Sequence, residues 1–393
     1  MSTPLADLQA LADEFTALRH DIHRHPELGY QEFRTSDLVA SCLEQWGYQV
    51  TRGLGGTGVV GQLRRGSSDK TLGLRADMDA LPIQEATGLA HASSHAGVMH
   101  ACGHDGHTAM LLAAAKHLAA KGRFKGTLNL IFQPAEEGLG GAKRMMDDGL
   151  FTQFPCDAVF AMHNMPGHPQ GQLLLRDGPT MASSDSILIT LQGVGGHGAV
   201  PQRAVDPVVA GATIVLGLQS IVARNIDPLQ MAVITVGAFI AGSAHNVIPE
   251  CATLKLSVRA LDREVRETLL RRIHELVTAQ AQSLGVTARI ECVSSYPVLV
   301  NTVAETDFAR RVAVELVGAS HVVPQTQPLT GSEDFAFFLE QVPGSYLLIG
   351  NGDGASAGHG ACMVHNSGYD FNDANLPIGA AYWALLTERF LAD

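Results

Sequence analysis

The sequence has few cysteines, and their spacing is not that of a disulfide framework. Six cysteines are scattered over 393 residues, and no two of them form a Cys-x-x-Cys pair. The first residues, Met1–Asp7, also lack the basic and apolar segments of a secretory signal peptide. These absences favour a reducing compartment, and we therefore expect a cytoplasmic protein.

Basic runs and long apolar runs are missing as well. The formal net charge is −12, and no stretch is rich in lysine and arginine, so we expect neither nucleic acid nor an anionic membrane surface as a partner. We find no apolar run of the roughly 20 residues that a membrane span needs, and we expect no span. Hydrophobic residues make up 46% of the chain, which is ample for a globular protein of two or three domains.

The densest group of metal-binding side chains lies in the stretch His-Ala-Cys-Gly-His-Asp-Gly-His, residues 100–107. Thiolate, imidazole and carboxylate groups bind borderline-soft divalent metals. The apolar run that follows has helical composition, so we predict a loop that enters a helix, with Asp105 or Thr108 near the helix cap. Any one of these histidines alone is better explained as part of a polar turn, but the cluster favours a metal site.

Three expected strands end in further polar residues. The strands are residues 71–76, 127–133 and 158–162, and the residues that follow them are Asp77, Asp79, Glu136, Glu137 and His163. In open α/β sheets, sites are built at the carboxyl ends of the strands. A further candidate, His365, lies near the C-terminus in the run Val-His-Asn-Ser-Gly. These groups are too many for one four-coordinate ion, and they suit two metals about 3.5–4 Å apart with a shared water.

Strands alternate with helices in the first part of the chain, which predicts an α/β fold with a central, mostly parallel sheet flanked by helices. From about residue 183 the expected order changes to βαββαβ, the pattern of a ferredoxin-like domain. We therefore predict a first part of the catalytic, metal-binding domain over residues 1–182, an inserted domain over 183–294, and the second part of the catalytic domain over 295–393.

Two glycine-rich segments, residues 53–58 and 193–198, match the dinucleotide fingerprint Gly-x-Gly-x-x-Gly. The first is followed by a strand-like run where a helix is required, and Pro201 interrupts the second. We interpret the first as a turn between strands. A nicotinamide-dependent dehydrogenase would rest on these two matches alone.

The chain also resembles a known family, the dinuclear metallohydrolases that include aminoacylases, carboxypeptidases of the G type and dipeptidases. Within it, the chain is most similar to the branch of hippurate hydrolases and auxin-conjugate hydrolases. The resemblance covers essentially the whole sequence. The motifs that carry it are DIHRHPELGYQE (21–32), LRADMDALPIQE (74–85), MHACGHDGHTAML (99–111), FQPAEEGLGGA (132–142), MHNMP (162–166), GGHGAVP (195–201), HNVIPE (245–250), GSEDFAFF (331–338) and HNSGYDFND (365–373).

This resemblance implies a zinc-exopeptidase-like catalytic domain and two divalent metal ions per subunit, which the donor types allow to be Zn, Mn, Co or Ni. The implied metal ligands are Cys102, His104, Glu137, His163 and His365. Glu136 is implied to be the general acid/base. Other branches carry a ligating histidine where this chain has Asp77, so here Asp79 is expected to orient a ligand and Asp77 is a doubtful ligand.

The resemblance assigns roles to the inserted domain as well. In the family this domain is the lid and the dimer interface, so we expect a homodimer, with a tetramer as a further option. In relatives, a histidine at the position of His197 reaches the partner's active site and polarises the scissile carbonyl, and the resemblance implies the same role for His197. Asn246 and Arg259 fall at the positions that bind the substrate carboxylate, although an arginine at a strand end is more often a rim charge.

Together these features predict metal-dependent hydrolysis of the amide bond of an N-acyl amino acid. Glu136 would take the proton of the metal-activated water and pass it to the leaving nitrogen. The nearest alternative is a dipeptidase or carboxypeptidase with the same chemistry. A non-catalytic metal-binding protein is a further alternative, which the presence of Glu136 disfavours because metal binding alone does not require it.

Overall fold

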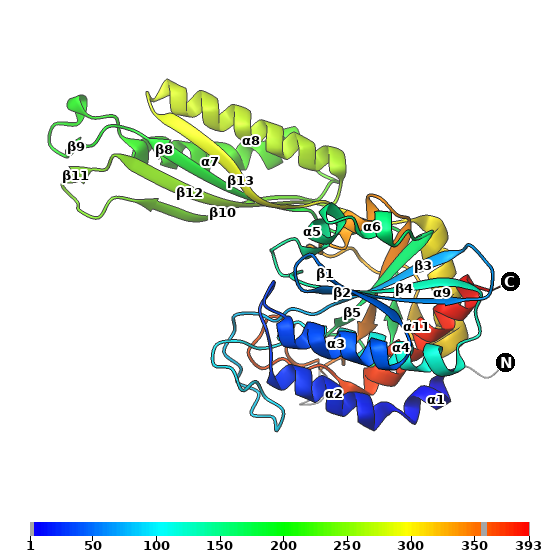
Figure 1. The fold of residues 1–393 in the computed structure, drawn as a ribbon. Helices are drawn as coiled ribbons and strands as arrows, with labels where there is room; N and C mark the ends of the chain where they lie inside the picture. Colours follow the sequence, from blue (N-terminus) through cyan, green and yellow to red (C-terminus); the bar gives the residue numbers. More distant parts are fainter. Residues whose placement is uncertain (1–3, 355–359, 393) are drawn as a thin grey trace. The chain divides into compact units, whose positions relative to one another are not determined.

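The computed structural model describes residues 4–354 and 360–392. The chain forms two compact units (Figure 1). The first contains the residues up to Gly178, Val300–Gln327 and the residues from Asp334 onward, and the second contains Pro179–Leu299 and Pro328–Glu333. The predicted boundaries at residues 182/183 and 294/295 stay predictions, because compactness alone does not define an independent domain.

An eight-stranded sheet forms the centre of the first unit. Its strands, in spatial order, are β1 (Gln49–Leu54), β2 (Gly58–Arg65), β4 (Gly126–Gln133), β3 (Thr71–Asp77), β5 (Ala158–Met165), β16 (Gly344–Gly350), β6 (Leu173–Leu174) and β15 (Val322–Val323). The four central strands β4, β3, β5 and β16 are parallel. β1, β2 and β6 introduce antiparallel pairs, so the sheet is mixed. The predicted α/β class is confirmed, with the parallel order confined mainly to the centre.

The parallel strands are buried over nearly their whole length, as expected for strands covered on both faces. Because they point the same way, β3, β4 and β5 bring their carboxyl ends to one edge of the sheet. The glycine-rich turn predicted between strands at residues 53–58 is also confirmed, since it joins β1 to β2.

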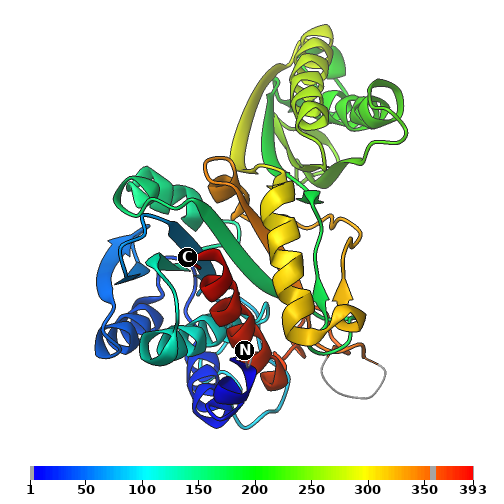
Figure 2. The same cartoon turned by 90° about the vertical axis from the view of Figure 1, so that its right-hand side faces the viewer.

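Helices cover this sheet. They are α1 (Leu5–Gln9), α2 (Ala12–Arg24), α3 (Phe33–Gln45), α4 (His104–Lys121), α5 (Gly141–Asp147), α6 (Leu150–Gln153), α9 (Val303–Val317), α10 (Ala336–Leu339) and α11 (Leu376–Phe390). α4 is buried along most of its length and packs on α11. α11 also lies beside α9 (Figure 2). α1 and α2 are separate helices near the N-terminus, and α10 has only four residues.

The second unit has the predicted βαββαβ order. Its main elements are β8 (Ser184–Gln192), α7 (Pro207–Asn225), β10 (Ala232–Ala241), β12 (Cys251–Ala260), α8 (Arg263–Ser283) and β13 (Thr287–Tyr296). The strands form an antiparallel sheet in the order β10-β12-β8-β13, and α7 and α8 pack on it (Figure 1). Alternate residues of β8 are buried, which matches a sheet with helices on one face. An aspartate, Asp206 or Asp262, caps each helix through two backbone N–H groups.

Short strands complete the second unit. β9 (Gly196–His197) pairs with β11 (Val247–Ile248) in a two-stranded sheet. The chain passes between the two units at β7 (Gly178–Met181) and β14 (Leu299–Asn301). His197 therefore lies on a short strand.

One helix bears on the expectation that the chain has no membrane span. By length and composition alone, α7 is apolar enough to cross a membrane, with a mean hydropathy of 1.5. Helices of globular cores can pass the same test. One side of α7, including Ala210, Ile214 and Leu218, is buried in the hydrophobic core of the second unit, while Val209 and Leu216 are exposed.

Candidate metal and catalytic site

The cysteine and histidine motif lies where the chain enters α4. His104 is the first residue of the helix, and Gly103 before it has a left-handed backbone with φ of 85°. A Cβ on Gly103 would lie 2.4 Å from both the Asn164 amide and the Tyr369 hydroxyl. Glycine is therefore required at this position for two reasons, the positive φ and the absence of space.

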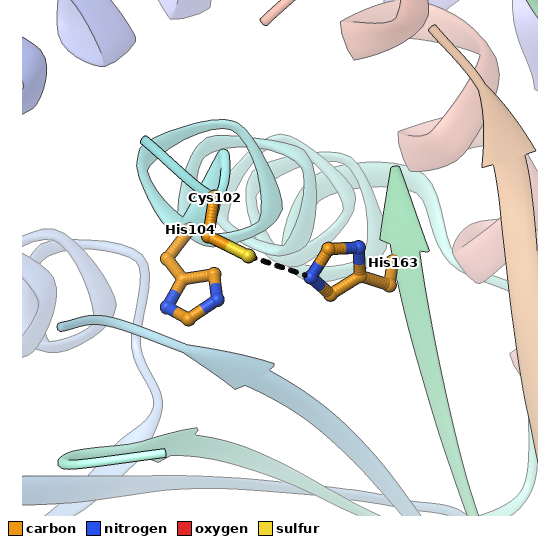
Figure 3. Close-up of side chains that lie close together, drawn as sticks. All are labelled: Cys102, His104 and His163. Carbon is orange, nitrogen blue, oxygen red and sulfur yellow. Dashed lines mark hydrogen bonds between the residues drawn. The ribbon is translucent and has the colours of Figure 1, made fainter. Parts of the chain in front are cut away.

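The predicted metal ligands lie together although they are far apart in sequence. Cys102 Sγ is 3.3 Å from His163 Nε2, and the His104 ring lies beside them (Figure 3). Three overlapping groups each bring three potential ligand atoms within 4.8 Å of one another. The groups are Cys102, His104 and His163; Cys102, Glu137 and His365; and His104, Glu136 and Glu137.

His365 reaches this cluster from the C-terminal part of the chain. Its backbone is left-handed, with φ of 64°, and its N–H donates to the carbonyl of Ala101 at 2.7 Å. Its Nε2 lies 3.1 Å from Glu137 Oε1, and half of the side chain is exposed. The strained backbone thus turns the imidazole toward Glu137 at the accessible side of the cluster.

Asp79 orients two of these residues. Its Oδ1 lies 3.2 Å from Nδ1 of His104, and its Oδ2 accepts the backbone N–H of Glu137 at 2.9 Å. Asp79 is almost completely buried. A carboxylate on one ring nitrogen fixes the orientation of the imidazole and leaves the other nitrogen available to a metal.

Asp77 has different partners. Its Oδ1 contacts Nδ1 of His107 at 2.6 Å, and its Oδ2 accepts a hydrogen bond from Arg75 at 2.7 Å. Although burial raises it, the pKa of Asp77 is held well below its ordinary value by His104, Arg75 and His107. His107 is engaged on both sides, because its Nε2 accepts the backbone N–H of Asn164. Asp77 and His107 therefore form a hydrogen-bonded pair next to the cluster and fix each other's side-chain orientation.

The donor set suits divalent metal ions. Among the described residues, His104 Nε2 is buried and has no hydrogen-bond partner, although it faces the cluster. Burial, Glu137 and Glu136 raise the pKa of the Cys102 thiol well above its ordinary value. The two carboxylates thus already place negative charge close to the thiol. Burial and the His107 ring lower the pKa of His163 well below its ordinary value, which keeps it in the neutral, ligating form. A bound cation would relieve the crowding of charge.

Glu136 lies beside the cluster on the loop that follows β4. It is buried, and its Oε1 accepts the backbone N–H of Asp334 at 3.4 Å. The Asp334 carboxylate is itself held by the Gln133 amide at 2.7 Å and by Arg75 at 3.3 Å. Sequence reasoning missed Arg75 and Asp334. The signal was available, because an arginine within a buried strand requires an acidic partner.

Three predicted site residues lie in the second unit. His197 and Asn246 are neighbours at the β9–β11 end, where the N–H of Gly198 donates to the Asn246 carbonyl at 2.8 Å. Arg259 is near the other end of β12 and donates to the carbonyl of Thr330 at 3.4 Å. β12 has ten residues, which corresponds to about 30 Å. Within one chain, Asn246 and Arg259 thus cannot bind the same carboxylate.

Asp105 lies in the first turn of α4, as predicted, but its side chain does not cap the helix. No side chain caps this helix. Instead, Asp105 Oδ2 lies 2.9 Å from Nδ1 of His23 and 3.2 Å from the guanidinium of Arg19. Arg19 also binds Asp370 at 2.9 Å. All three of Asp105, His23 and Arg19 are fully buried, so this ion network ties α2 to the start of α4 and to the segment after His365.

Comparison with known proteins agrees with this arrangement. Residues 73–389 match the peptidase family M20/M25/M40. The chain belongs to this family. It is 47% identical to the hippurate hydrolase of Campylobacter jejuni, over 98% of this chain and 99% of that protein. It is 37% identical to the IAA-amino acid hydrolase ILR1-like 4 of Arabidopsis thaliana, over 99% of this chain and 88% of that protein.

Among solved structures, the chain is similar to the YXEP protein of Bacillus subtilis, described as a dinuclear metal binding peptidase of the M20 family. The TM-score is 0.82, the sequence identity is 31%, and the match covers 98% of this chain and 99% of that one. The predicted relationship to the hippurate hydrolase and auxin-conjugate hydrolase branch is confirmed.

We predict that the buried ion network makes stability depend on pH through His23. Although burial lowers it, the Asp105 carboxylate raises the pKa of His23 from 6.5 to about 9. The stabilisation is therefore complete below pH 6.5 and is lost as the pH rises through about 9. It is on the order of 3 kcal/mol. Thermal unfolding of the wild type and of His23→Gln should show a Tm difference that shrinks between these limits. A constant difference over the range would contradict the assignment.

Proposed function

We propose that this protein hydrolyses the amide bond of N-acyl amino acids of the hippurate type and releases a carboxylic acid and an amino acid. The observation that carries the proposal is the cluster of Cys102, His104, Glu137, His163 and His365 with Glu136 beside it. The near full-length similarity to a hippurate hydrolase supports the choice of substrate class. The proposal includes a cytoplasmic location, in keeping with six cysteines that are all free.

The proposed cofactors are two divalent metal ions, held by the five residues of the cluster. The sulfur, nitrogen and oxygen donors admit Zn, Mn, Co or Ni. When bound, such ions lower the pKa of a water toward neutrality and polarise the scissile carbonyl. Asp79 would hold the ring of His104 and the backbone of Glu137 in place for this binding.

Glu136 is proposed to be the general acid/base. Its carboxylate would accept the proton of the attacking water and then donate it to the departing amide nitrogen. The hydrogen bond from the Asp334 backbone to Oε1 restrains one carboxylate oxygen. Glu136 and Glu137 each place a carboxylate oxygen within 4.8 Å of a His104 ring nitrogen, so both can serve the same site, and we assign metal binding to Glu137 and proton transfer to Glu136.

The second unit is proposed to serve as lid and dimerisation domain. His197 Nδ1 accepts the backbone N–H of Ala199 at 3.0 Å, so the neutral ring carries its proton on Nε2 and can donate it to the oxygen of the scissile carbonyl. Arg259 and Asn246 would bind the substrate carboxylate. Because Asn246 precedes the start of β12 and Arg259 is next to its last residue, we propose that His197 and Asn246 act on the partner's site while Arg259 acts on its own. A tetramer would be a pair of such dimers.

A substrate panel with metal analysis tests the activity itself. We expect about two equivalents of divalent metal per chain and faster turnover of benzoyl-glycine and other acyl amino acids than of dipeptides. The family contains peptidases, so preferential cleavage of dipeptides or of C-terminal residues of longer peptides would favour the peptidase alternative. Stoichiometric metal without turnover of any of these substrates would favour a metal-binding protein.

The role of Glu136 is tested by Glu136→Gln. We expect kcat for benzoyl-glycine to fall by about 10²–10⁴-fold, because the amide cannot carry the proton, while the metal content stays at the wild-type value. Glu137→Gln is the matched variant at the neighbouring position and should lose metal affinity together with activity. Near wild-type turnover of metal-loaded Glu136→Gln would show that another group is the base.

The exchange of residues between subunits is tested with tagged heterodimers. A dimer of one His197→Ala subunit and one Glu136→Gln subunit contains a single complete site, so we expect about half of the wild-type turnover per dimer. In the control, a wild-type subunit is paired with a subunit that carries both substitutions. Action in trans predicts that this control is inactive, whereas action within one chain predicts half activity for it and none for the first heterodimer.

A further inference from the structure

The loop that carries Glu136 begins with an unusual backbone. Ala135 has a φ of 54°, a left-handed conformation that costs a residue with a Cβ about 1–2 kcal/mol. Ala135 is fully buried. Such a conformation persists only where the surroundings determine it, so contacts with other residues must hold Ala135 in place.

One of these contacts is a hydrogen bond to a buried glutamate, Glu32. The N–H of Ala135 donates to Glu32 Oε1 at 2.8 Å, and the hydroxyl of Thr57 donates to Glu32 Oε2 at 2.6 Å. Glu32 has no exposed surface. On the other side, the Ala135 carbonyl accepts the N–H of Gly141 at 3.0 Å. Both backbone groups of Ala135 are therefore held, and the first of them is held by a side chain from a distant part of the sequence.

The packing around Glu32 leaves this segment little freedom. A Cβ on Gly29, three residues before Glu32, would lie 3.0 Å from Ala135 Cα and 2.7 Å from a methyl of Leu139. A Cβ on Gly141 would lie 1.7 Å from the carbonyl oxygen of Pro134. Residues 29–32 thus pack directly against the loop that carries Glu136. On the other side, Gly141 packs against the backbone of Pro134 in the same loop.

We infer that Glu32 is a positioning residue for Glu136, which acts by holding Ala135 in its left-handed conformation. The carboxylate of Asp79 accepts the N–H of Glu137 at 2.9 Å, so buried carboxylates grip the chain on both sides of Glu136. Rotation of the backbone at Ala135 would swing the Glu136 side chain away from the reacting atoms. The catalytic consequence rests on the proposed function, but the backbone consequence does not.

The backbone consequence is tested by hydrogen–deuterium exchange of the peptide that covers residues 132–139. In Glu32→Ala the Ala135 amide loses its acceptor, and we expect at least tenfold faster exchange there. Glu27→Ala is the matched control. Glu27 belongs to the same motif and accepts the backbone N–H groups of Arg34 and Thr35 in α3, so its loss should leave this peptide protected. Unchanged exchange in Glu32→Ala would overturn the inference whether or not the protein hydrolyses acyl amino acids.

Turnover then tests the catalytic consequence, with wild-type activity on benzoyl-glycine as the separate test of the proposed function. We expect Glu32→Ala to lower kcat at least tenfold with KM and metal content nearly unchanged, and Glu32→Gln, which keeps an acceptor oxygen, to stay within threefold of the wild type. Ala135→Gly should restore part of the lost turnover, because glycine adopts positive φ without strain.

Two results would overturn the catalytic role. One is an equal loss of kcat in Glu27→Ala, which would indicate general destabilisation. The other is the absence of any rescue of Glu32→Ala by Ala135→Gly. If Glu32→Ala does not fold, Glu32→Asp replaces it, since its carboxylate is one methylene too short to reach Ala135, and the same results are expected.

Discussion

The carboxylates of Asp77 and Asp79, at the end of β3, are the groups on which the rest of the site depends. Asp79 holds the ring of His104 and the backbone of Glu137, and Asp77 holds the ring of His107. Both carboxylates are buried, so their hydrogen bonds are strong and their loss would leave other polar groups without partners. The residues that face the cluster are thus placed by a layer of acidic groups beneath them.

Buried acidic groups need buried cations, and two arginines supply them. Arg75 joins Asp77 to Asp334, and Arg19 joins Asp105 to Asp370. Each arginine therefore connects a segment next to the cluster with a segment from the C-terminal third of the chain. Removing one partner of such a pair is expected to cost about 3–5 kcal/mol, because the remaining charge stays buried. These buried ion pairs, together with packing, hold distant segments of the first unit in fixed positions relative to one another.

Backbone strain is concentrated at the same place. Among the described residues, left-handed non-glycine backbones occur at Tyr30, Ala135 and His365. Ala135 directly precedes Glu136, and His365 is itself a member of the cluster. In both cases a distant segment supplies the hydrogen bond that stabilises the conformation, Glu32 for Ala135 and Ala101 for His365. Strain of this kind is tolerated where it places a functional group.

The sequence by itself determined the α/β class and the βαββαβ order of the second unit, because periodicity is local, and the resemblance of its motifs to a known family singled out the residues of the cluster. It did not determine the roles of Glu32, Arg19, Arg75 and Asp334, since a buried ion pair or a carboxylate on a distant N–H depends on how segments meet in space. The tertiary structure also decided that Asp105 binds Arg19 rather than capping α4. Likewise, the separation of Asn246 and Arg259 follows from the length of β12, which spacing in the sequence does not reveal.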